Sequence, residues 1–260
     1  MKNNQNKKYK LIVFDIDGVL NEHGGNILPE SKQAIRLLKK SGIQVGYASG
    51  KHAWYIQGGL VWSGLLDQDT MIVAENGGVI YDPHTKKTLV EDKFLNDVKL
   101  LRSIFYNLYS KNQGFLNFSG LTVWEEPKQS LFCLFPQNTA DVPRLAKVMA
   151  EIVKINKLNL YIVENPDSVD VIQQGINKAT GLKHLCAWSN LDLEDIIAVG
   201  DSYNDLEMLA AAGFAITLAN GKDEIKKLVL KRKNQGLVTK QACGKGVLEA
   251  SNYLIAKKLI

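Results

Sequence analysis

The chain has 260 residues, of which 45% are hydrophobic and 23% are charged. This composition is typical of a globular protein that buries a core in one large domain or two modest ones, and it excludes a disordered chain. The formal net charge of +5 is mild, and no basic stripe interleaved with aromatic residues indicates a nucleic-acid partner.

Strand and helix patterns alternate in the first and last thirds of the chain, which predicts a parallel sheet with helical crossovers. The elements expected in the first third span residues 11–14, 30–40, 44–48, 51–60 and 70–74. Those expected in the last third span residues 178–188, 196–199, 205–212, 214–218, 222–230 and 247–259.

A segment of different character separates these two parts. Residues 81–84 form a turn sequence, and mixed helix and strand patterns follow it. The elements expected there span residues 96–110, 121–125, 131–135, 142–155, 160–163 and 169–173. We therefore predict an α/β core with a Rossmann-like parallel sheet over residues 1–84 and 175–260, interrupted by an inserted α+β domain over residues 85–174.

Two carboxylates end the first predicted strand. Asp15 and Asp17 lie one residue apart and start on the same side of the strand, at its C-terminal end. That end is where ligands bind in open α/β sheets. Such a pair repels unless a cation lies between the two groups or one of them is protonated, and Mg²⁺ would leave one carboxylate free to attack an electrophile. An acidic, solvated turn is the plainer alternative.

Two later sites carry groups suited to a phosphate. Ser49 and Gly50 follow a strand, where a hydroxyl and bare backbone N–H groups can donate to phosphate oxygens, although Ser-Gly is more often a plain turn. Lys178 begins a helix, and its charge opposes the helix dipole. That cost is reasonable if the ammonium pairs with carboxylates and a bound phosphate. Otherwise Lys178 is a surface lysine.

The strand predicted at 196–199 ends on another acidic turn. Asp201 lies at the strand tip, as Asp15 does, and the two strands are candidates for neighbours in one sheet. Asp201 would then complete an oxygen site for Mg²⁺, with Asp205 supporting it directly or through water. Asp205 is also well placed to cap the following helix.

Taken together, the motifs DIDGVL, ASGK, GINKATGL and GDSYND resemble those of the haloacid dehalogenase superfamily, in the family's order and over nearly the whole chain. The resemblance is to phosphatases of the Cof-like branch (subfamily IIB), in which the insertion is a C2-type cap that sets substrate specificity. The stretches around residues 75–78 and Trp124 are similar to archaeal-type phosphoglycolate phosphatases and to the sucrose-phosphatase-like group. The resemblance implies a Mg²⁺-dependent phosphatase that hydrolyses a small phosphorylated metabolite, such as phosphoglycolate or a sugar phosphate, through an aspartyl-phosphate.

The resemblance also assigns roles to residues. Asp15 would be the nucleophile, and Asp17 the general acid that later activates water. The groups implied to bind the phosphate are Ser49, Gly50, Lys178 and Asn204, and those implied to bind Mg²⁺ are Asp15, the Asp17 backbone carbonyl, Asp201 and Asp205. Two positions depart from the family: Lys51 replaces a frequent arginine, and Val19 replaces the usual threonine.

Two other functions stay open at this stage. A phosphosugar mutase of the phosphomannomutase type would share the core and the cap type, and a non-catalytic phosphometabolite-binding protein would share the fold. No dinucleotide or Walker-type loop follows a predicted strand. Trp54, Tyr55 and Trp62 are expected to pack in the core or at an interface.

Cysteine spacing and apolar run lengths bear on the cellular setting. Cys133, Cys186 and Cys243 are odd in number and far apart, which favours reduced thiols. No apolar run approaches the ~18 residues of a membrane span, and the basic stretch 1–10, expected to be solvated, lacks the apolar run of a signal peptide. We therefore expect a cytoplasmic protein with no membrane partner; the sequence gives no indication of oligomeric state.

Overall fold

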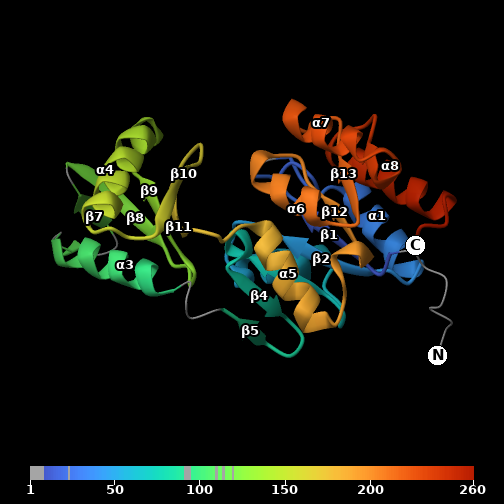
Figure 1. Cartoon of the computed structure of the whole chain (residues 1–260), viewed down its shortest axis with the longest axis horizontal. Coiled ribbons are helices and arrows are strands. Elements are labelled where there is room, and N and C mark those ends of the chain that lie inside the picture. The colour runs from blue at the N-terminus through green and yellow to red at the C-terminus, as the bar shows by residue number, and fades with distance from the viewer. Residues whose placement is uncertain (1–8, 23, 91–94, 109–110, 113–114, 119) are drawn as a thin grey trace. The chain divides into compact units, whose positions relative to one another are not determined.

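The computed structural model describes residues 9–22, 24–90, 95–108, 111–112, 115–118 and 120–260 (Figure 1). The chain divides into two compact units. The core unit comprises Met1–Leu89 and Asn177–Ile260, and the inserted unit comprises Val90–Ile176. The chain passes between units at 89/90 and at 176/177, against boundaries predicted at 84/85 and 174/175. The first boundary is later than predicted because β5, which follows the predicted turn, belongs to the core sheet.

The core unit is built on one eight-stranded sheet with the order β14-β13-β12-β1-β2-β3-β4-β5. Its strands are β1 (Leu11–Asp15), β2 (Gln44–Ala48), β3 (Met71–Ala74), β4 (Val79–Asp82), β5 (Lys87–Leu89), β12 (Ile196–Val199), β13 (Phe214–Thr217) and β14 (Gly236–Val238). The run from β14 to β3 is parallel, whereas β4 and β5 are antiparallel additions. The predicted α/β class with a parallel sheet is confirmed, and β1 and β12 are neighbours.

Helices pack against the core sheet, and all of them except α5, which follows the inserted unit, come directly after a parallel strand. They are α1 (Pro29–Lys40), α2 (Ala53–Ser63), α5 (Lys178–Ser189), α6 (Leu206–Ala211), α7 (Asp223–Lys231) and α8 (Cys243–Ala256). Helix α1 shows why the sequence folds this way: Pro29 occupies its first turn, and Ala34, Ile35 and Leu38 are spaced to bury one face. Helices α1 and α8 pack together, while α5, α6 and α7 contribute to a second apolar cluster with strand residues such as Val13.

The inserted unit has a separate antiparallel sheet with the order β10-β11-β9-β8-β7-β6. Its elements are α3 (Asn96–Leu108), β6 (Lys111–Asn112), β7 (Phe115–Phe118), β8 (Leu121–Glu126), β9 (Leu131–Pro136), α4 (Val142–Ile155), β10 (Leu160–Glu164) and β11 (Val169–Gln173). Helices α3 and α4 share one apolar cluster with the alternate strand residues Val123, Phe132 and Val171. This unit therefore has a core of its own. The predicted end of its first helix, at residue 110, lies outside the described residues.

One expectation about exposure was wrong, and another was wrong in part. Tyr9, expected to be solvated, is 1% exposed, and its ring packs edge-on against Phe214 with centroids 5.7 Å apart. Trp54, Tyr55 and Trp62, expected in the core or at an interface, are exposed on α2, which excludes the core and leaves the interface untested. The three cysteines are free thiols, and no helix of the described chain is both long and apolar enough to cross a membrane.

Candidate active site

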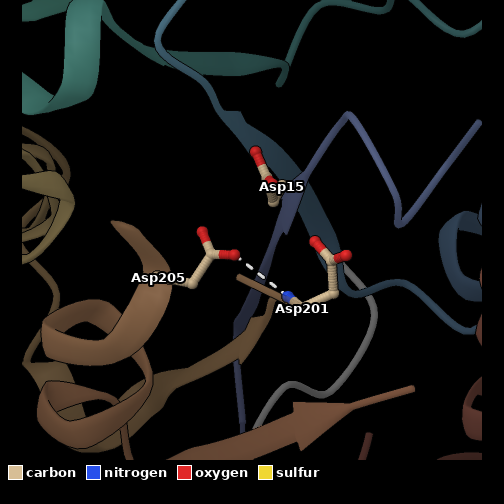
Figure 2. Close-up of side chains that lie close together, drawn as sticks. All are labelled: Asp15, Asp201 and Asp205. Carbon is tan, nitrogen blue, oxygen red and sulfur yellow. Dashed lines mark hydrogen bonds between the residues drawn. The ribbon is translucent and has the colours of Figure 1, made fainter. Parts of the chain in front are cut away.

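The site lies where neighbouring parallel strands end. Asp15 is the last residue of β1, and Asp201 follows β12 after one glycine. Phe14 pairs with Val199, so the two strands end at the same edge of the sheet. Asp205 joins them from the start of α6, and carboxylate oxygens of the three aspartates lie within 4.8 Å of one another (Figure 2). The sheet register thus gathers three buried carboxylates that are distant in sequence.

Lys178 is the cation of this cluster. Its side chain is 1% exposed, and Nζ donates to Asp15 Oδ1 at 2.8 Å and to Asp205 Oδ1 at 2.6 Å. Burial alone lowers the pKa of Lys178, but the charges of Asp15 and Asp205 outweigh that effect and raise it. Burial and the charge of Asp205 raise the pKa of Asp15 to about 7, against the opposing effect of Lys178. One ammonium therefore compensates the three carboxylates only in part.

Both carboxylate oxygens of Asp205 accept hydrogen bonds from the protein. Oδ1 accepts from Lys178, and Oδ2 accepts from the backbone N–H groups of Asp201 (3.0 Å) and Ser202 (3.1 Å). The second of these closes a capping box at the short 3₁₀ turn Tyr203–Asp205. Through these hydrogen bonds Asp205 fixes the loop that carries Asp201 and so positions the Asp201 side chain in the site.

The cluster fits a divalent cation. When all three aspartates are ionised, the single ammonium leaves about two negative charges uncompensated in a buried space, and carboxylate oxygens are the ligands that Mg²⁺ prefers. Gly18, at φ +79°, lets the β1 loop approach closely, since a Cβ there would lie 2.3 Å from Asp201 Oδ2. Asp15 and Asp201 are the side chains best able to bind the ion directly, and Asp205 would act through water.

Asp17 lies apart from this carboxylate cluster. Its carboxylate forms an ion pair with Lys51 and accepts a hydrogen bond from Asn21 Nδ2 at 3.2 Å. The Asp17 side chain is 24% exposed and that of Lys51 is 33% exposed, so a ligand in solution can reach this pair. The pair requires an ionised Asp17, whereas proton donation requires the neutral acid. A group that competes for Lys51 would therefore release Asp17.

The other predicted phosphate-binding residues differ from one another in burial and in the groups that they contact. Ser49 is 3% exposed, and its Oγ accepts from the Lys51 backbone N–H at 3.2 Å. Gly50 lies beside Asn76, whose side chain would be 3.2 Å from an added Cβ. Asn204 is exposed, and its Oδ1 accepts from Ser202 Oγ at 2.6 Å. Lys178 is therefore the predicted phosphate ligand that the structure joins directly to Asp15.

The sequence interpretation missed Asn220. Its Nδ2 donates to the Gly18 carbonyl at 2.8 Å and to Asp201 Oδ2 at 3.2 Å, and its Oδ1 accepts from the Cys243 backbone N–H at 3.0 Å. It therefore ties the loops after β1 and β13 to Asp201. A signal was present, because Asn220 follows β13 at the same edge of the sheet as Asp15 and Asp201.

We expect the contribution of Asp15 to the free energy of unfolding of the metal-free protein to fall as the pH rises from about 4 to about 7. Burial raises the pKa of Asp15 from 3.8 to about 7, so in this window the folded state binds more protons than the unfolded state. The contribution of Asp15 has a slope of up to about 1.4 kcal/mol per pH unit. Denaturant titrations in EDTA at several pH values measure it.

Asp15→Asn should remove that contribution, whereas Asp67→Asn should keep it. Burial tends to raise the pKa of Asp67, but hydrogen bonds from Lys39 and Thr70 and the charge of Lys39 lower it overall. A lowered pKa makes the folded state bind fewer protons than the unfolded state, so Asp67 makes no contribution of this sign. If the free energy of unfolding of Asp15→Asn has the same slope against pH as that of the unmodified chain, the raised pKa does not belong to Asp15.

Comparisons with known proteins give concordant matches. A family model described as haloacid dehalogenase-like hydrolase matches residues 12–132 and 121–250. A phosphoglycolate phosphatase of Methanobrevibacter smithii is 29% identical over 244 residues, which cover 92% of this chain and 95% of the relative. Phosphoglycolate phosphatase 1 of Saccharolobus solfataricus is 28% identical over 250 residues, covering 95% and 96%. A crystal structure of a haloacid dehalogenase-like hydrolase from Bacteroides thetaiotaomicron superposes with a TM-score of 0.73 at 20% identity, covering 95% of this chain and all of the other.

Proposed function

Because the chain belongs to the haloacid dehalogenase-like hydrolases, we propose that it is a Mg²⁺-dependent phosphatase that hydrolyses a small phosphorylated metabolite through an aspartyl-phosphate. The observation that carries this proposal is the buried contact of Asp15 with Lys178, beside Asp201 and Asp205. A nucleophilic carboxylate, a fixed cation and further oxygen ligands are the groups that phosphoryl transfer requires. The names of the relatives support a phosphate monoester as substrate.

In the first step, an oxygen of Asp15 attacks phosphorus, and the bond from phosphorus to the leaving-group oxygen breaks. Lys178 Nζ, within 2.8 Å of Asp15, would neutralise charge on the phosphoryl group as it is transferred. The Ser49 hydroxyl and the Gly50 N–H would donate to its other oxygens. When bound, Mg²⁺ would offset the charge of the carboxylates, which otherwise repel the anionic substrate.

Asp17 moves the protons of both steps. As the neutral acid it gives its proton to the departing oxygen, and as a carboxylate it then takes a proton from the water that attacks phosphorus. This second attack breaks the bond from phosphorus to Asp15, so inorganic phosphate leaves and Asp15 is regenerated. The ion pair with Lys51 opens in this scheme when the substrate phosphate competes for the ammonium.

We further propose that the inserted unit selects the substrate. It is a separate α+β unit with its own sheet and core, and its removal from the chain would leave the strand ends of the core sheet intact. Residues of this unit are therefore available for specificity without any role in holding the nucleophile.

The test of the proposed function is phosphate release from a panel of esters, measured with Mg²⁺ and with EDTA. The panel contains phosphoglycolate, sugar phosphates and p-nitrophenyl phosphate. We expect release that stops in EDTA and returns when Mg²⁺ is added. Exchange of phosphate between sugar positions with little release would instead indicate a mutase. Binding of esters without release or exchange would indicate a non-catalytic protein.

A further inference from the structure

The outer face of α2 exposes large aromatic side chains. Trp54, Tyr55 and Trp62 are 69%, 65% and 92% exposed, while Ile56 and Leu60 of the same helix are buried. The helix therefore has an apolar inner side, as its packing requires, and also an aromatic outer side that packing does not require. A gathering of exposed aromatic groups next to a catalytic site indicates a binding surface.

Two adjacent glycines, Gly58 and Gly59, lie in the middle of this helix. Glycine weakens a helix interior relative to alanine. Neither residue has a positive φ, and a Cβ on either would meet no atom of the described chain within 4 Å. Close packing inside the described structure therefore does not account for them. They leave open space on the surface of α2, in which a molecule can approach the helix backbone.

A groove of about 540 Å³ runs along this part of the core unit. The three aromatic residues and the two glycines of α2 line it on one side, and residues 24–27 of the loop after β1 also contribute. Asp17 and Lys51 line the same groove, and Lys51 Nζ lies 5.8 Å from the centre of the Tyr55 ring. The groove is thus continuous with the group assigned to protonate the leaving oxygen.

We propose that this groove is the leaving-group subsite and that it prefers phosphate monoesters with a planar, aromatic leaving group. The inference rests on the proposed function, because it requires Asp17 to touch the leaving-group oxygen. The atoms attached to that oxygen then occupy the space next to Asp17. Tyr55 and the two tryptophans offer ring faces and edges for a flat group, and the volume is that of a small-molecule site. A two-carbon glycolate group would leave most of the groove to water.

The test compares 2-naphthyl phosphate with phosphoglycolate in steady-state kinetics with Mg²⁺. Gly58→Leu places a side chain in the groove, and leucine favours the helix, so the fold is retained. We expect its KM for 2-naphthyl phosphate to rise about tenfold, and its KM for phosphoglycolate to change less than about twofold. Trp62→Ala should give the same pattern. The matched control is Val61→Leu, which adds bulk on the exposed side of α2 outside the groove and should change neither KM.

Calorimetric titration separates this inference from the proposed function. In the Asp15→Asn background, which has no nucleophile, 2-naphthyl phosphate should bind about tenfold more weakly when Gly58→Leu is added. If the unmodified chain hydrolyses no ester, the proposed function fails. The effect of Gly58→Leu on the affinity for 2-naphthyl phosphate then tests by itself whether the groove binds the aromatic group. Equal KM changes for both esters, equal affinity with and without Gly58→Leu, or no binding of 2-naphthyl phosphate would overturn the subsite.

Discussion

Asp15→Asn is expected to lower phosphate release by at least about 10⁴-fold, because the amide cannot act as the nucleophile. The substitution preserves the size of the side chain and leaves the contact of Lys178 with Asp205 in place. Phosphate release from the preferred ester of the panel measures the loss. Acid quenching of the unmodified enzyme during turnover, followed by mass spectrometry, should find a phosphoryl group on the peptide that contains Asp15.

The control for this prediction is Asp67→Asn, which makes the same chemical change at a partly exposed aspartate paired with Lys39. It should keep full activity. Release at the unmodified rate by Asp15→Asn would remove Asp15 from the reaction, and an adduct on a different peptide would identify another nucleophile.

Lys178→Met is expected to reduce the free energy of unfolding of the metal-free protein by about 3–5 kcal/mol at pH 8, because it leaves two buried carboxylates without their cation. The loss should be smaller at pH 5. Lys178 lowers the pKa of Asp15, so without the lysine Asp15 takes up a proton, and a neutral carboxyl is less costly to bury. Urea denaturation in EDTA at the two pH values measures both effects.

Lys10→Met provides the comparison for an exposed ion pair. Lys10 Nζ lies 2.9 Å from Asp195 Oδ2, but its side chain is 54% exposed, so its removal should cost less than about 1 kcal/mol. If both variants lose the same small amount, the cluster around Lys178 is more hydrated than its 1% exposure implies.

The parts of the site that the sequence predicted share one physical basis. Each motif follows an apolar run, and parallel strands place such positions at one edge of a sheet. Asp15 and Asp201 could therefore be placed together from strand ends alone, and the pairing of β1 with β12 confirms it. The inward position of Lys178 was predictable only together with the acidic motifs. A lysine at a helix start is unfavourable by itself, and its pairing with Asp15 and Asp205 offsets that cost.

The parts that the sequence did not predict depend on tertiary contacts with weak local signals. Strands β5 and β14 are only three residues long, too short for a clear alternation of apolar and polar residues, and β4 ends within residues 81–84, which form a turn sequence. Tyr9 is buried because its ring finds Phe214, which is distant in sequence. The exposure of Trp54 and Trp62 could not be foreseen, since composition indicates burial of aromatic residues in general and not which side of a helix they occupy.

The strand order of the core sheet has a consequence for synthesis of the chain. Strand β1 is made before the inserted unit, yet one of its edges pairs with β12, which begins at Ile196. On the ribosome that edge stays unpaired until the whole of Val90–Ile176 and helix α5 have been translated. An apolar strand with an open edge is a template for wrong pairing. The β12-facing edge of β1 is therefore open to wrong pairing throughout the interval in which the inserted unit is made.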